Sequence, residues 1–138
     1  MIKLIIGKKG SGKTKHLIEA VKEAANNTNG NVVCVEQGPV LTYDIPSSVR
    51  LVNTENYNIS GYEAFYGFLA GICAGNYDLT NLFIDATLRI GGRDYNEFAE
   101  FIVKVNELAK VSDTEITFTV SCDESDIPAK VFEVAQKA

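Results

Sequence analysis

Three glycines, a lysine and a threonine near the N-terminus have the types and spacing that bind phosphate. Segment 7–14 reads GKKGSGKT, which matches the pattern G-x-x-x-x-G-K-[ST] at every fixed position. Glycine lets a backbone approach an anion closely, so the N–H groups of the loop can converge on a phosphate at the start of a helix. We expect Lys13 to reach the β- and γ-phosphates of a nucleotide and the Thr14 hydroxyl to ligate Mg²⁺. The predicted phosphate-binding residues are Gly7, Lys8, Lys9, Gly10, Ser11, Gly12, Lys13, Thr14 and Lys15.

A second candidate group is the carboxylate of Asp85, which directly follows the apolar run 82–84. An acid at the carboxyl end of a buried strand would face the phosphate loop. Carboxylate oxygens bind Mg²⁺ directly or through water. Thr14 and Asp85 are therefore the predicted metal-binding residues, and Lys13 and Asp85 are predicted to be catalytic.

The elements that must position these groups alternate between strand and helix. Short apolar runs predict strands at 2–6, 31–36, 49–52, 81–85 and 116–120, the third of them at an edge. Apolar residues at helical spacing predict a helix after the glycine loop. Further helices are predicted after the capping-box pattern from Ser60 to Glu63, after a cap at Asp94, and from 125–128 with proline in the first turn. Residues 38–48 and 89–93 are predicted to be loops.

This alternation predicts the fold class. Strands that alternate with helices imply βαβ units and a mainly parallel sheet. The length of 138 residues suits one domain. We therefore expect a single α/β domain over residues 1–138, a three-layer α/β/α sandwich with a mainly parallel sheet of about five strands.

Segment 7–14 and the 82–85 strand end together make the chain similar to the P-loop NTPase superfamily. The specific resemblance covers residues 1–14 and the strand at 81–85, which looks like a Walker B strand. One helix separates Asp85 from the strand at 116–120. In the additional-strand class, which includes RecA-like, AAA-type and thymidine-kinase-like folds, that later strand inserts between the first strand and the Walker B strand. The resemblance therefore favours this class over the kinase–GTPase class.

The chain departs from the family at the residue after Asp85. Many members place a glutamate there to polarise the attacking water, and this chain has Ala86. Glu36, at the end of the second predicted strand, is the candidate substitute and the third predicted catalytic residue, because some RecA-like proteins carry their glutamate in a comparable place. It could instead be an ordinary acid at a strand end, and Asp44 is a weaker alternative.

Polar residues in the following segment are further candidates. Thr87 could contact the γ-phosphate or cap the turn. Arg89 and Arg93, in a segment with two glycines, could neutralise transition-state charge or could be surface arginines of a mobile loop. Ser121, at the end of the strand at 116–120, is the more plausible polar group to face the γ-phosphate there.

Composition and net charge limit the classes of partner that we expect. The net charge of -5 argues against a general affinity for nucleic acid, which needs a basic surface. No apolar run approaches the ~20 residues that a membrane span needs, and the first run is too short for a signal peptide. We therefore expect a cytoplasmic protein without a membrane partner. Three widely spaced cysteines, Cys34, Cys73 and Cys122, predict neither a disulfide framework nor a metal site.

Three functions remain in competition. The leading hypothesis is a small Mg-ATP-binding protein that hydrolyses ATP slowly or with the help of a protein partner, which could be a second copy of the chain. The second is a kinase that phosphorylates a nucleoside or another small molecule. The third is a non-catalytic interaction module that depends on nucleotide. The chain lacks the guanine-selecting Asn-Lys-x-Asp motif, which weakens a Ras-like GTPase interpretation.

Overall fold

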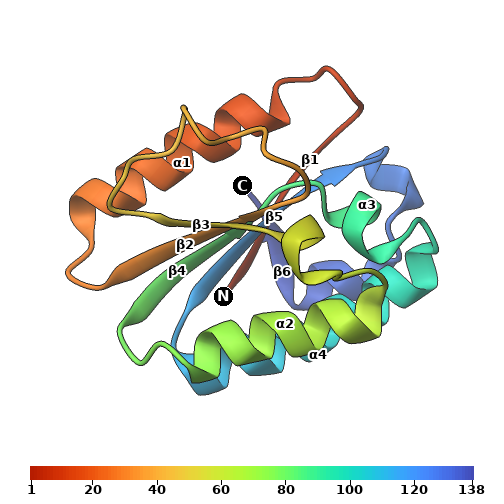
Figure 1. The fold of residues 1–138 in the computed structure, drawn as a ribbon. Coiled ribbons are helices and arrows are strands. Elements are labelled where there is room, and N and C mark those ends of the chain that lie inside the picture. The colour runs from red at the N-terminus through yellow and green to blue at the C-terminus, as the bar shows by residue number, and fades with distance from the viewer.

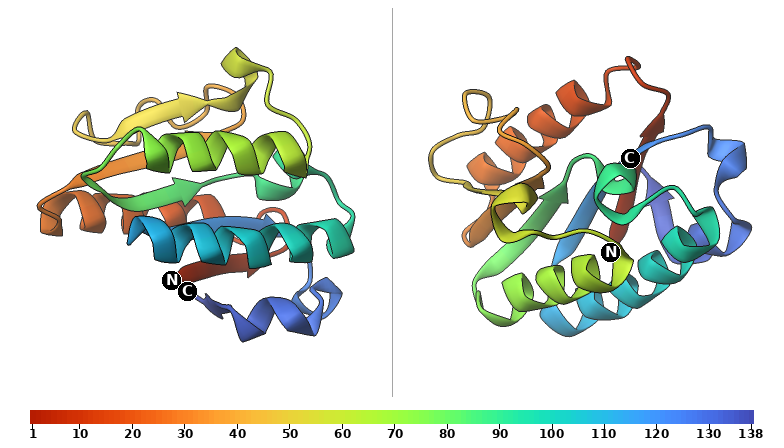
Figure 2. Two further views of the ribbon diagram at one scale, coloured as in Figure 1. Left: turned by 90° about the horizontal axis from the view of Figure 1, so that it is seen from below. Right: turned by 45° about the vertical axis from the view of Figure 1, so that its right-hand side comes forward.

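The fold is a parallel sheet with helices on both faces. The computed structural model describes all 138 residues. Its six strands are β1 (Ile2–Gly7), β2 (Asn31–Glu36), β3 (Arg50–Asn53), β4 (Leu79–Ile84), β5 (Glu115–Ser121) and β6 (Ala135–Lys137). Its helices are α1 (Lys13–Asn27), α2 (Tyr62–Ala74), α3 (Thr87–Gly91) and α4 (Tyr95–Ser112). Helix α1 covers one face of the sheet, and α2 and α4 lie side by side on the other (Figures 1 and 2). The expected three-layer α/β architecture is therefore present.

The strand order brings the predicted functional segments together at the end of the sheet where the strands have their carboxyl termini, which we call the carboxyl edge. The order is β3-β2-β4-β5-β1-β6, and every neighbouring pair is parallel. Strand β5 thus lies between β1 and β4, the position that the resemblance implied for the strand at 116–120. Because all strands are parallel, the loop after β1 and Asp85 after β4 lie at the same carboxyl edge.

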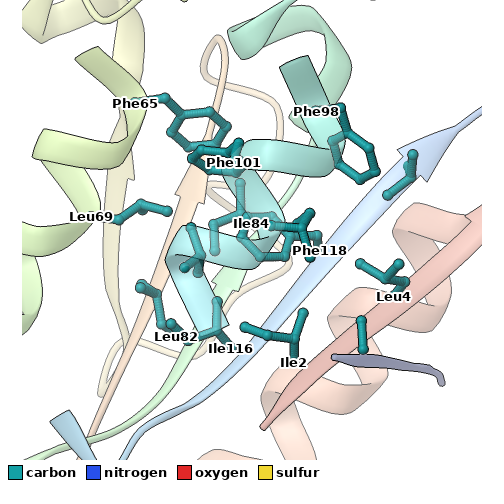
Figure 3. Packing of buried hydrophobic residues seen from close by; sticks show 14 of the residues in the cluster. Ile2, Leu4, Phe65, Leu69, Leu82, Ile84, Phe98, Phe101, Ile116 and Phe118 are labelled. Carbon is teal, nitrogen blue, oxygen red and sulfur yellow. The ribbon is translucent and has the colours of Figure 1, made fainter. Parts of the chain in front are cut away.

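The larger hydrophobic core lies between the sheet and the pair α2–α4. It contains 26 buried residues, against nine in the cluster on the α1 side. Four phenylalanines pack at its centre, and the rings of Phe65 and Phe101 stack with centroids 4.8 Å apart (Figure 3). The labelled residues of this core are Ile2, Leu4, Phe65, Leu69, Leu82, Ile84, Phe98, Phe101, Ile116 and Phe118. This packing fixes the strands whose ends carry the candidate site.

Strand β5 has two different faces. Ile116, Phe118 and Val120 belong to the core with α4, so the alternate residues face the α1 side. Those residues are all polar: Glu115, Thr117, Thr119 and Ser121. A central strand therefore presents a row of polar side chains toward α1, and this row ends at the carboxyl edge.

Two predictions about elements were wrong, and a sixth strand adds to the sheet of about five that was expected. Residues 87–91, assigned partly to a loop, form α3, because Ala86 turns the chain with φ 60° and its carbonyl accepts from the N–H groups of Arg89 and Ile90. The predicted final helix is instead two 3₁₀ turns, η2 (Glu124–Asp126) and η3 (Ala129–Glu133), followed by β6. The sheet therefore has six strands, because β6 pairs with β1 at the edge.

The capping predictions had mixed outcomes. Ser60 does not cap α2, because Gly61 is the N-cap residue and its φ of 86° sets the entry of the chain. Asp94 does cap α4, since its Oδ1 accepts from the N–H groups of Asn96 and Glu97 at 2.9 and 3.1 Å. The edge strand predicted at 49–52 is present as β3, one residue later. A third 3₁₀ turn, η1 (Thr54–Tyr57), follows it.

Candidate functional site

The glycine loop joins β1 to α1 and wraps around its own lysine. Gly10 and Gly12 have φ values of 84° and 90°, in the left-handed region that other residues avoid. A Cβ on Gly7 would overlap the Ser11 hydroxyl. The Nζ of Lys13 donates to the carbonyl of Lys8 at 2.9 Å, and Lys13 is only 9% exposed. The loop geometry therefore depends on its glycines and holds the lysine at the start of α1.

Asp85 lies opposite this loop. Its own N–H donates to Val35 O of β2 at 2.9 Å, which holds the residue in line with the sheet. The hydroxyl of Thr14 donates a long hydrogen bond to Asp85 Oδ2 at 3.5 Å. The two residues predicted to bind metal are thus neighbours, although 70 residues of chain separate them.

Thr119 is a site residue that the sequence did not reveal. Its hydroxyl donates to Asp85 Oδ1 at 2.6 Å and accepts from the N–H of Ala86 at 3.0 Å. Thr119 is 2% exposed, so water does not compete for these bonds. The only signal in the sequence was a polar residue within a strand, and strand order was needed to place it beside Asp85.

A cavity of about 750 Å³ is present elsewhere, but the candidate site is a different cavity of about 610 Å³ at the carboxyl edge. Its lining combines the glycine loop, the end of β4, the segment before α4 and the end of β5. The lining residues that bear on its chemistry are Lys8, Lys9, Gly10, Lys13, Thr14, Asp85, Arg89, Arg93, Tyr95, Ser121, Cys122, Asp123 and Asp126. The structure therefore brings together most of the predicted groups.

The arginines and lysines make the cavity locally positive. Five cations line it together with the carboxylates of Asp85, Asp123 and Asp126. Arg93 Nη2 donates to the carbonyl of Ser121 at 2.7 Å, which ties the segment between α3 and α4 to the end of β5. Arg89 and Arg93 form no ion pair. Their charge is therefore available to an anionic ligand, within a chain whose net charge is -5.

Other predicted residues lie outside this cavity. Glu36 is 3% exposed, and its Oε1 accepts from the backbone N–H groups of Val40 and Leu41 at 2.9 Å each. It holds the loop after β2 and does not line the cavity. Asp44 is exposed in that loop, and Lys15 is exposed on α1. Thr87 is fully buried, and its hydroxyl has no hydrogen-bond partner.

The thiol of Cys122 lines the cavity but is not poised as a nucleophile. Burial raises its pKa, the carboxylates of Asp126 and Asp123 raise it further, and Arg93 and Lys13 lower it in part. A raised pKa keeps the thiol protonated, and the thiolate is the reactive form. All three cysteines are buried and free, so the expectation of no disulfide framework is confirmed.

The donor set at the site fits Mg²⁺. Thr14 and Asp85 supply hydroxyl and carboxylate oxygens, the hard ligands that Mg²⁺ prefers. Mg²⁺ is commonly bound by one or two protein ligands, with phosphate and water completing its shell. When bound, Mg²⁺ supplies positive charge that neutralises phosphate oxygens.

Comparisons with known proteins do not identify the chain. No protein-family model matches it, and a search of curated proteins finds no significant match. None of its helices has the length and apolar character required to span a membrane.

Proposed function

We propose that this chain is a P-loop protein of the additional-strand class that binds Mg-ATP and hydrolyses it slowly or with a partner's help. The observation that carries the proposal is the approach of Thr14 to Asp85 at 3.5 Å across the end of β5. A glycine-rich turn that matched the motif by chance would have no reason to face an acid from another strand.

The loop conformation adds independent support. Two glycines take left-handed conformations and a third has no room for a Cβ. This backbone starts α1 at Lys13, where the helix dipole also favours an anion. Lys8, Lys9, Arg89 and Arg93 extend the positive charge around the same cavity. A ligand with several negative charges, such as a triphosphate with its metal, suits this distribution.

Slow hydrolysis follows from the groups that surround Asp85. Ala86 stands where many P-loop proteins carry the glutamate that polarises water. Glu36 is the substitute that the sequence predicts, yet two backbone N–H groups already bind its Oε1. These bonds hold the carboxylate on the loop after β2, and Glu36 does not line the cavity, so it is poorly placed to polarise a water beside the phosphates. Hydrolysis at a useful rate would need a group from a partner, which could be a second copy of the chain.

A small-molecule or nucleoside kinase is the second candidate function. The cavity continues from the glycine loop to Arg93, Tyr95 and Asp126. This extension offers a cation, an aromatic ring and a carboxylate to a second small molecule beside the phosphates. A nucleotide-dependent interaction module is the third candidate and requires binding without any chemistry.

The experiment that tests the proposal combines binding and turnover. Purified protein is titrated with ATP, GTP and ADP, with and without Mg²⁺, while thermal stability and phosphate release are followed. At a ligand concentration of roughly 100 Kd, binding should stabilise the fold by about 2.7 kcal/mol. Lys13→Ala should abolish this gain, because it removes the buried lysine whose Nζ the loop holds through the carbonyl of Lys8. Lys3→Ala is the matched control, since Lys3 lies on β1 but pairs with Glu115 away from the site.

The outcomes separate the candidate functions. ATP-dependent stabilisation with slow phosphate release supports the ATPase. Stabilisation with transfer of phosphate to a member of a nucleoside and metabolite panel supports the kinase. Stabilisation with neither supports the interaction module. If no nucleotide shifts the melting temperature of the wild type, the central proposal is wrong and the glycine loop is only a turn.

A further inference from the structure

One hydroxyl joins the candidate metal ligand to the backbone of the following helix. The register pairs Ile84 of β4 with Phe118 of β5, so the next residues, Asp85 and Thr119, lie side by side. The Thr119 hydroxyl has one hydrogen, which it donates to Asp85, and it accepts from the N–H of Ala86. A shift of the Asp85 carboxylate therefore changes the acceptor on which Ala86 depends.

The segment that begins at Ala86 has two unfavourable features. Ala86 has φ 60° and ψ 39°, a left-handed conformation that costs a non-glycine residue roughly 1–2 kcal/mol. Thr87 is fully buried, and its Oγ1 finds no hydrogen-bond partner. Buried polar atoms without partners are rare in folded proteins. A rearrangement of this segment could relieve both features, so the observed conformation depends on whatever holds Ala86 in place.

The far end of the segment is also held by a hydroxyl. The Tyr62 hydroxyl donates to the carbonyl of Gly92 at 2.6 Å, and its ring occupies the space where a Cβ on Gly91 would lie. Burial is the main cause that raises the pKa of Tyr62, so this donor stays protonated. Helix α3 is thus bounded by Thr119 at its start and Tyr62 at its end. Between them, Arg89 projects into the candidate cavity.

We propose that Thr119 is a positioning residue that aligns Asp85 for metal binding and couples that binding to the conformation of residues 86–92. The proposal rests on the proposed function, because it needs nucleotide and Mg²⁺ at Asp85. It adds to that function a specific route from the site to α3. When the Asp85 carboxylate turns toward a cation, the hydrogen bond from Thr119 follows it, and the left-handed Ala86 loses its restraint.

The test uses Thr119→Val, which keeps the shape of the side chain and removes both hydrogen bonds. Thr119→Ser restores the hydroxyl. Thr117→Val is the matched control, because Thr117 is equally buried on the same face of β5 but lies beside Phe83, away from Asp85. Two quantities are measured: the ATP affinity with and without Mg²⁺, and amide hydrogen exchange of residues 86–92. Thr119→Ala replaces the valine variant if the latter does not fold.

Mg²⁺ should increase the ATP affinity of Thr119→Val about 10- to 100-fold less than it does in the wild type, the range typical of residues that orient metal ligands. The variant's Mg²⁺-free ATP binding should be unchanged, because Lys13 and the loop are intact. Without ligand, amides of 86–92 should exchange faster in this variant, and Mg-ATP should no longer alter them. Thr119→Ser and Thr117→Val should behave as the wild type.

The contrary outcomes are distinguishable. If Thr119→Val keeps the wild-type Mg²⁺ dependence and the wild-type response of residues 86–92, Thr119 has no positioning role and this proposal falls alone. If Thr117→Val causes the same losses, the effect belongs to β5 in general and the proposal also falls. If the wild type binds no nucleotide, the proposed function falls and takes the coupling with it.

Discussion

The two ends of β5 border two different hollows, and only one of them has the structure of a site. Toward the amino end, Glu115 and Thr117 line an open groove of about 750 Å³ between α1 and the sheet. At the carboxyl end, Ser121 lines the smaller cavity of about 610 Å³ with the glycine loop and Asp85. Both hollows are rich in polar residues. They differ in what those polar groups are bound to.

In the groove, the charged groups pair with each other or face solvent. Lys3 and Glu115 form an ion pair at 2.8 Å, and His16 and Glu23 are exposed on α1. In the cavity, by contrast, Asp85 is 9% exposed and hydrogen-bonded, and the loop opposite it holds left-handed glycines. Ordered burial of charge and special backbone conformations have a cost in stability. Such features, rather than the volume of a hollow, indicate function.

The largest expected difference between the hollows concerns β4, because Asn81 of this strand lines the groove and Asp85, directly after it, lines the cavity. Asp85→Asn should lower the Mg²⁺-dependent part of the ATP affinity on the order of 100-fold or more, because removal of a ligand costs at least as much as loss of an outer partner. Asn81 lies four residues before Asp85 and lines the groove. Asn81→Ala should therefore leave ATP binding unchanged. Calorimetric titration with and without Mg²⁺ measures both. Equal losses in the two variants would remove the distinction between the hollows.

The features of the cavity that could be predicted from the sequence are those determined by short patterns of neighbouring residues. The glycine loop, the acid after β4 and the cap at Asp94 depend on neighbours within a few residues. The part that could not be predicted depends on register. Thr119 contacts Asp85 only because β5 pairs with β4 with Ile84 opposite Phe118. The residues near Thr119 in the sequence do not indicate this pairing.

Two other features also depend on how the chain folds beyond the local pattern. Glu36 is interpreted from its place at a strand end, and the chain after it folds back so that Val40 and Leu41 donate to its carboxylate. Residues 89–91 of α3 fall in a predicted loop, because the segment 89–93 contains two glycines and two arginines. Helix α3 forms because Ala86 adopts a left-handed conformation. This conformation is rare for residues other than glycine, so the alanine gives no indication of it.

A smaller effect should separate two cysteines, one that lines the candidate cavity and one that does not. Cys122 lines the candidate cavity, whereas Cys73 lies near the end of α2. Burial raises the pKa of both thiols, so the folded protein should react with iodoacetamide only at a higher pH than a free cysteine does. Because the unfolded chain ionises its thiols first, the stability should fall as the pH rises above the ordinary thiol pKa. Mg-ATP should slow alkylation of Cys122 several-fold and leave Cys73 unchanged.

Mass spectrometry of the alkylated peptides measures the two rates in one sample. Cys73 is the internal control for a general stabilisation of the fold, which would slow both reactions together. Equal protection of the two thiols would therefore show that nucleotide acts on global stability, and it would contradict binding in the cavity beside Cys122. Cys34 is fully buried, and burial with the nearby carboxylates of Asp85 and Glu36 raises its pKa, so it should stay unlabelled.

The smallest expected effect concerns the ion pair in the groove. The side chains of Lys3 and Glu115 are 38% and 37% exposed, so solvent screens their attraction and the coupling should be about 0.2–1 kcal/mol. A double-mutant cycle with Lys3→Ala, Glu115→Ala and the double variant measures this coupling from urea unfolding, and salt should reduce it. All three variants should keep the full stabilisation by Mg-ATP, because the pair lies toward the amino end of the strands and the glycine loop lies at the carboxyl end. A coupling well above this range, or a loss of nucleotide binding in any of the three, would mean that the groove is organised as tightly as the cavity and that polar order does not distinguish the two ends of β5.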